Sequence, residues 1–116
     1  MRCLLVLNDP PYGSERSYNG LRLALSLAKQ EQAEVRVFLM GDAVGCAVAG
    51  QVTPAGYYNL ERMLEALVRR GADVACCGTC LKARGIGDER LVEGARHSSL
   101  EELTDAVLWA DRVLSF

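Results

Sequence analysis

Short apolar runs alternate along the chain with longer segments in which apolar residues recur every three or four positions. Five of the runs are predicted to be strands: 3–7, 35–40, 72–77, 95–97 and 113–116. The first run is apolar throughout and is followed by Asn8-Asp9-Pro10-Pro11. An unbroken apolar run that ends in turn-forming residues is typical of a strand buried on both faces of a parallel sheet.

The segments between these runs carry the helical pattern. The clearest helix repeats apolar residues on one face: Leu60, Met63, Leu64, Leu67 and Val68. Gly71 follows two arginines there and marks the end of the helix. Another helix is predicted to start near Ser14, with Ser14 as its N-cap. Further helices are predicted over 43–49, 79–84 and 100–110, the last capped by Ser98 or Ser99, and a loop over 50–56.

Alternation of strands and helices predicts an α/β sandwich with a mostly parallel sheet and right-handed crossovers. The 116 residues are enough for one hydrophobic core, so we expect a single domain over residues 1–116. In such sheets, functional groups gather at the carboxyl ends of the strands. The loops expected there span residues 8–13, 41–46 and 77–85.

Composition excludes several functional classes. The net charge is −2, from 13 basic and 15 acidic residues, which argues against a protein that binds nucleic acid through phosphate neutralisation. The longest apolar runs are too short to span a membrane or to form a signal peptide, so a cytoplasmic protein without a membrane partner is predicted. The glycines form neither a dinucleotide-binding nor a P-loop motif, and no cofactor is expected.

The five cysteines, at positions 3, 46, 76, 77 and 80, are the informative departure from average composition. An odd number without an export signal argues against a disulfide framework. Cys77 lies where a strand ends and a helix begins, so backbone N–H groups should point at its sulfur and lower the pKa of the thiol. Lys82 and Arg84 add positive charge nearby. Cys3, Cys46 and Cys76 are interpreted as buried packing residues.

The pair Cys77-Gly78-Thr79-Cys80 admits three chemistries. Half of a zinc site is the first, but a second ligand pair is missing and His97 is the only histidine, so no metal is expected. Thiol–disulfide exchange is the second, with Cys80 one helical turn from Cys77. The third is sulfur transfer, in which a thiolate holds sulfane sulfur as a persulfide and the second cysteine is not strictly needed.

Other residues near the predicted strand ends are candidates for the surroundings of Cys77. Asn8 and Tyr12 either line the pocket or serve as ordinary turn residues. Gly41 and Asp42 follow the second strand, and Asp42 either caps the short helix or orients a group in the site. His97 is interpreted as a surface or helix-start residue rather than as a base.

Several motifs along the whole chain together resemble the DsrE/DsrF-like family, most closely its YchN-like branch. They are 8–15 (NDPPYGSE), 21–24 (LRLA), 38–44 (FLMGDAV), 56–59 (GYYN), 77–80 (CGTC) with 84–86 (RGI), and 110–116 (ADRVLSF). The resemblance implies a three-layer α/β/α domain with a five-stranded, mostly parallel sheet. It also implies a homo-oligomer, either a trimer or a hexamer.

The resemblance further implies a role in sulfur relay. Relay members of the family carry a persulfide on a cysteine eight positions before the glycine of an Arg-Gly pair, which here selects Cys77, counted to Gly85. Sulfur-donor and acceptor proteins would then be its partners, with Gly78 and Thr79 as backbone donors to the anion. Cys80 has no counterpart in the relay members, although the YchN-like branch carries a similar cysteine. A thiol–disulfide oxidoreductase and a non-catalytic oligomeric binding protein are the alternatives.

Overall fold

Five parallel strands form one sheet in the order β4-β3-β2-β1-β5. The computed structural model describes residues 1–54 and 56–116. The strands are β1 Arg2–Leu7, β2 Glu34–Leu39, β3 Asp73–Cys77, β4 Ala95–Ser98 and β5 Arg112–Ser115. The five-stranded parallel sheet is therefore confirmed, and each predicted strand lies within one residue of its observed bounds.

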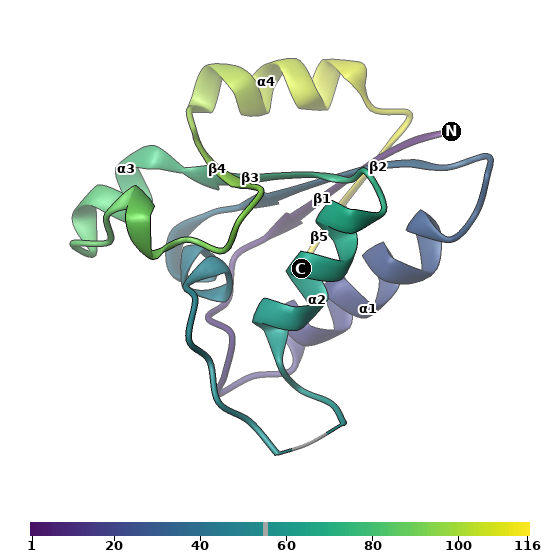
Figure 1. Ribbon diagram of the computed structural model, residues 1–116. Coiled ribbons are helices and arrows are strands. Elements are labelled where there is room, and N and C mark those ends of the chain that lie inside the picture. The colour runs from purple at the N-terminus through teal and green to yellow at the C-terminus, as the bar shows by residue number, and fades with distance from the viewer. Residues whose placement is uncertain (55) are drawn as a thin grey trace.

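Helices cover both faces of the sheet, as Figure 1 shows. The helices α1 (Arg16–Ala28) and α2 (Leu60–Arg69) lie on one face, and α4 (Leu100–Trp109) lies on the other. The chain moves outward from β1 to β4 and then returns across the sheet to β5. Because crossovers are right-handed, this reversal puts α4 on the opposite face. The predicted three-layer sandwich is confirmed.

Three short helical segments gather at the carboxyl end of the sheet (Figure 1). They are the 3₁₀ helix η1 (Gly41–Ala47), the helix α3 (Gly78–Ala83) and the 3₁₀ helix η2 (Asp88–Arg90). The helix η1 follows β2 after the single residue Met40. The helix α3 begins at the residue directly after β3. Two of the three loops in which the sequence predicts functional groups therefore lie together at this end of the sheet.

The core lies between the sheet and the pair α1 and α2. Leu5 and Leu7 of β1 and Leu39 of β2 are fully buried, as expected of central strands covered on both faces. The apolar stripe of α2 packs against them through its fully buried side chains Leu60, Leu64 and Leu67. The edge strands β4 and β5 keep most of their side chains at least partly exposed.

The helix ends differ in part from the prediction. Asn59 caps α2 by accepting the Arg62 N–H at 3.1 Å, and Ser99 caps α4. The prediction that Ser14 caps α1 is wrong, because the helix begins at Arg16 and the Ser14 hydroxyl donates to the Asp9 carboxylate at 2.7 Å.

The segment predicted as a helix over 43–49 is instead the 3₁₀ helix η1, which begins at Gly41 and ends at Ala47. Asp42 lies in its first turn, and the N-cap is Met40. The predicted loop over 50–56 contains no helix or strand among its described residues. Ala55, within that loop, lies outside the described residues.

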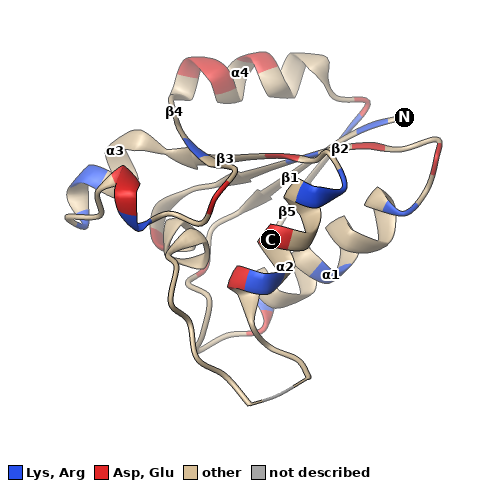
Figure 2. Cartoon of the chain, viewed as in Figure 1, with Lys and Arg blue, Asp and Glu red and all other residues tan. Residues whose placement is uncertain are grey.

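Charged residues of both signs are spread over the helices and connections (Figure 2). Acidic residues are prominent on α4, α2 carries both signs, and the charged residues of α1 are arginines. In the described part of the chain, no helix is both long enough and apolar enough to cross a membrane.

Truncation of the central core residue of α2 tests this packing. Leu64→Ala should lower the free energy of unfolding by about 2–5 kcal/mol, because it removes buried methyl groups and leaves a cavity. Urea unfolding followed by circular dichroism measures the change. Leu23→Ala on α1 is the matched control, since Leu23 is 37% exposed, and its loss should be clearly smaller. Equal losses would contradict the assigned core.

Candidate functional site

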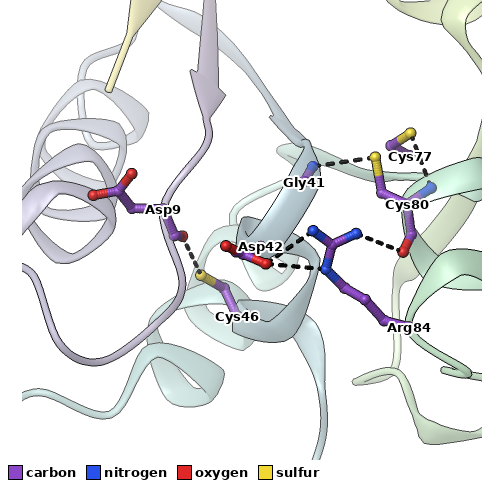
Figure 3. A network of polar contacts seen from close by, with 7 residues as sticks. All are labelled: Asp9, Gly41, Asp42, Cys46, Cys77, Cys80 and Arg84. Carbon is purple, nitrogen blue, oxygen red and sulfur yellow. Dashed lines mark hydrogen bonds and ion pairs between the residues drawn. The ribbon is translucent and has the colours of Figure 1, made fainter.

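Cys77 is the last residue of β3 and also the N-cap of α3. Its backbone is extended, with ψ at 117°, and the chain turns directly into the helix at Gly78. The Cys77 sulfur accepts the Cys80 backbone N–H at 3.4 Å (Figure 3). The Thr79 hydroxyl lies 3.2 Å from the same sulfur. A thiol thus occupies the place that a serine or aspartate oxygen fills in ordinary helix caps.

These hydrogen bonds decide the acidity of Cys77. Burial raises the pKa of the thiol, since only 8% of the residue is exposed. Hydrogen bonds from the Cys80 and Thr79 side chains and backbone N–H groups oppose burial, and together they hold the pKa below its ordinary value. Hydrogen bonds to the charged form favour that form. The lowered pKa of Cys77 agrees with the sequence prediction, with side chains contributing beside the expected backbone groups.

Cys80 has the opposite shift. Burial raises the pKa of its thiol, and the hydrogen bond to Cys77 raises it further. The Cys80 sulfur accepts the backbone N–H of Gly41 at 3.1 Å, which acts in the other direction (Figure 3). Gly41 has a φ of +55°, a conformation that favours glycine. The predicted site residue Gly41 therefore contacts the second cysteine through its backbone.

An ion pair joins the two loops around the cysteines. The Arg84 Nη2 lies 2.8 Å and its Nε 3.1 Å from Asp42 Oδ1, and Nη1 donates to the Cys80 carbonyl at 3.0 Å (Figure 3). Both side chains are more than a third exposed, so the pair contributes little stability, about 1 kcal/mol or less. Its effect is geometric, because it ties η1 to α3.

The remaining three cysteines are buried, as the sequence predicts. Cys3, Cys46 and Cys76 are between 0% and 2% exposed. Burial raises the pKa of Cys46 and of Cys76 to about 12 in each case. Neither thiol forms a useful amount of thiolate near neutral pH. The pKa values of two adjacent thiols therefore shift in opposite directions, since Cys76 lies in the core and Cys77 caps a helix.

Gly78 allows His97 to approach the site. From the sequence, His97 is interpreted as a surface or helix-start residue. A Cβ at Gly78 would lie 2.2 Å from His97 Nε2 and 2.7 Å from the Ser98 carbonyl oxygen, so only glycine lets β4 approach this closely. His97 Nδ1 in turn lies 3.0 Å from Asp88 Oδ1. Spacing along the chain gives no sign of this contact, because it depends on the pairing of Cys76 with His97 between β3 and β4.

Asn8 and Tyr12, predicted to line the pocket, make their polar side-chain contacts elsewhere. The Asn8 amide donates to the Ser115 hydroxyl and the Phe116 carbonyl, at 3.2 and 3.0 Å. The Tyr12 hydroxyl donates to the side-chain oxygen of Gln51 at 2.5 Å. Asn8 therefore ties β1 to the last strand, and Tyr12 holds the loop after η1.

The described residues contain no group of three or more His, Cys, Asp or Glu side chains placed to hold a metal ion. Cys77 and Cys80 would supply two ligands, and a structural zinc site needs four. What the arrangement offers is one thiol of lowered pKa beside a second thiol of raised pKa, on a rigid turn between a buried strand and a helix.

Sequence comparisons match the chain along its full length. The sequence model of the DsrE/DsrF-like family matches residues 1–116. Protein YchN of Escherichia coli is 42% identical over 116 residues, which cover 99% of this chain and 98% of YchN. An uncharacterized protein of Methanocaldococcus jannaschii is 37% identical, and the match covers 100% of both chains.

Structural comparisons agree. The crystal structure of YchN from E. coli superposes with a TM-score of 0.93 at 42% identity, covering 100% of this chain and 99% of that one. A protein of unknown function from Methanobacterium thermoautotrophicum superposes with a TM-score of 0.75 at 15% identity, covering 99% and 98% of the two chains. The second likeness shows the fold alone.

Removing the Thr79 hydroxyl tests its part in the acidity of Cys77. Thr79→Val should raise the pKa of Cys77, and therefore slow alkylation of Cys77 by iodoacetamide at pH 7 by about two- to tenfold, since one hydrogen bond contributes about 1 kcal/mol. Fragment-ion mass spectrometry resolves Cys77 from its neighbours. Thr104→Val on α4, where the hydroxyl donates to the Leu100 carbonyl, is the control. An unchanged Cys77 rate in Thr79→Val would contradict the assignment.

Proposed function

Because this chain belongs to the DsrE/DsrF-like family, we propose that it handles sulfur and that Cys77 carries sulfane sulfur as a persulfide. The observation that carries the proposal is the sulfur of Cys77 at the start of α3, where it accepts the Cys80 N–H at 3.4 Å. A thiolate is the nucleophilic form of cysteine. The lowered pKa of Cys77 supplies that form nearer to neutral pH.

The loading step is a displacement at sulfur. The Cys77 thiolate attacks the outer sulfur of a donor persulfide R–S–S–H. The bond between the two donor sulfurs breaks, a bond between Cys77 Sγ and the outer sulfur forms, and the donor leaves as R–S⁻. The reverse displacement by an acceptor thiolate unloads the sulfur. The donor and acceptor are thiols of partner proteins in this proposal, and the transfer needs no cofactor or metal.

Cys80 gives the loaded protein a second route. Its backbone N–H donates to Cys77 Sγ at 3.4 Å, and the two thiols shift each other's pKa, so the two side chains are neighbours. Attack of the Cys80 thiolate on Cys77 Sγ would form a Cys77–Cys80 disulfide and release hydrosulfide. The raised pKa of Cys80 keeps this route slow until the Cys80 proton is removed.

The same contact favours a second candidate function, thiol–disulfide exchange. Cys77 would attack a substrate disulfide and Cys80 would resolve the mixed disulfide, which leaves the substrate reduced and the pair oxidised. Both functions use the same nucleophile. They differ in whether Cys80 is required, and this difference makes Cys80 the residue that separates them.

The setting of either function is proposed to be the cytoplasm, where thiols stay reduced. We also propose that the chain is a homo-oligomer, a trimer or a hexamer. The strand β5 and the helix α4 leave apolar side chains exposed: Leu100 at 66%, Leu108 at 80% and Val113 at 47%. Exposed apolar patches are typical of contact surfaces, and light scattering after gel filtration gives the number of subunits.

Incubation with a persulfide donor tests the proposed carrier. The intact protein should gain the mass of one sulfur atom, and peptide mapping should place it on Cys77. Cys77→Ser should gain none. Cys76→Ala is the matched control, because it removes the neighbouring thiol, whose pKa is about 12, and it should load like the wild type. An equal gain in Cys77→Ser would overturn the proposal.

Removal of the second thiol separates the two candidate functions. Cys80→Ser should keep full sulfur loading on Cys77 and lose the hydrosulfide that the loaded wild type releases on standing. A methylene blue assay measures the hydrosulfide. If sulfur loading also fails in Cys80→Ser while Cys77 still reacts with iodoacetamide, dithiol exchange replaces persulfide carriage as the better description.

A further inference from the structure

A cavity of about 440 Å³ lies beside the start of α3. Its lining includes the two residues that follow Cys77, namely Gly78 and Thr79, together with His97 of β4. Small-molecule sites in proteins begin at about 300 Å³. The Thr79 hydroxyl lies 3.2 Å from the Cys77 sulfur, so one wall of the cavity touches the nucleophile.

His97 is held in this cavity in one orientation. Its ring lies against Gly78, with Nε2 2.2 Å from the position that a Cβ of residue 78 would occupy. Its Nδ1 lies 3.0 Å from the Asp88 carboxylate. A carboxylate only accepts hydrogen bonds, so Nδ1 donates to Asp88, and Nε2 takes no part in that bond. The His97 side chain is half exposed, which leaves it accessible to a ligand.

Sulfur displacement at Cys77 is faster when a proton is supplied on the other side of the reaction. Attack on a donor persulfide or disulfide expels a thiolate, and an aliphatic thiolate, whose thiol has a high pKa, leaves more slowly than an aromatic one unless it is protonated as it departs. Histidine is the side chain that carries and releases a proton most readily near neutral pH. Lys82 of α3 and Glu101 of α4 also line the cavity. These two charges suit a small thiol that carries both a carboxylate and an amino group.

We propose that this cavity receives the departing thiol of a low-molecular-weight persulfide or disulfide, and that His97, oriented by Asp88, gives the thiolate its proton. The inference rests on the proposed role of Cys77, and it adds a small-molecule donor at the same site to the partner-protein donors proposed above. In the step, Cys77 Sγ forms a bond to the outer sulfur while the donor S–S bond breaks. The electron pair of that bond goes to R–S⁻. The proton on Nε2 of the imidazolium then yields R–SH and neutral imidazole.

The test compares two leaving groups in a Cys80→Ser background, which removes the thiol that could resolve a mixed disulfide on Cys77. Bis(2-hydroxyethyl) disulfide expels an aliphatic thiolate that benefits from protonation. Dithiobis(nitrobenzoate) expels an aromatic thiolate that is stable without a proton. His97→Gln should slow mixed-disulfide formation on Cys77 by about tenfold or more with the aliphatic probe. The rate with the aromatic probe should stay within about twofold. Mass spectrometry follows both reactions.

A second pair of variants isolates the orienting carboxylate. Asp88→Asn should show the same preference as His97→Gln, with a smaller loss. Glu89→Gln removes the same charge from the next residue of η2, whose carboxylate packs on Gly87, and should leave both rates unchanged. An Asp88→Asn variant that behaves as the control would overturn the role of Asp88.

The outcomes also separate this inference from the proposed function. Equal slowing with both probes would show a structural effect of His97→Gln and overturn the inference, as would no slowing with either. Sulfane loading on Cys77 together with either of these results would leave the proposed function standing. A leaving-group preference without sulfane loading would have the reverse meaning. It would support the protonation of the leaving thiol by His97 and would overturn persulfide carriage on Cys77.

Discussion

Backbone pairing of β3 with a parallel strand on each side determines which groups can meet at Cys77. Leu39 of β2 pairs with Cys76, and Cys76 pairs with His97 of β4. The carboxyl ends of the three strands therefore lie side by side at one end of the sheet. Gly41 approaches Cys77 from the side of β2, and His97 approaches from the side of β4. A slip of one residue in either pairing would turn the alternating side chains to the opposite face.

Two thiols one helical turn apart are made chemically unequal by hydrogen bonds to backbone and hydroxyl groups. Cys77 accepts the Cys80 N–H of its own helix and lies beside the Thr79 hydroxyl, whereas Cys80 accepts the Gly41 N–H and has its pKa raised by Cys77. The pair therefore loses its first proton from Cys77. Because the two sulfurs interact, this acidity belongs to the pair as a unit. A substitution at either cysteine changes the chemistry of the one that remains.

Much of the fold could be predicted because its signals are local. Continuous apolar runs marked the strands, and Gly71 and Ser99 lie where helix ends require such residues. The position of Cys77 between strand and helix could be predicted for the same reason. The start of α1 could not, because the Ser14 hydroxyl bonds to the Asp9 side chain.

The surroundings of Cys77 depend on contacts between distant segments, and these left no local signal. The contact of Gly41 with Cys80 and that of Gly78 with His97 each join two strands or their extensions. Asn8 and Tyr12 had the right residue types in the right loop. Their partners, Ser115 and Gln51, draw their side chains toward other parts of the molecule. Residue type and loop membership place a side chain near an edge of the sheet, whereas its direction depends on packing.

The missing side chain of Gly78 has a consequence for how this sequence can vary. A Cβ at position 78 would lie 2.2 Å from His97 Nε2 and 2.7 Å from the backbone oxygen of Ser98, so β4 constrains position 78 although His97 lies 19 positions further along the chain. A smaller side chain at 97 would relieve the first contact but not the second, because the Ser98 oxygen belongs to the backbone. Position 78 should therefore stay glycine among homologous sequences even where the residue at position 97 changes.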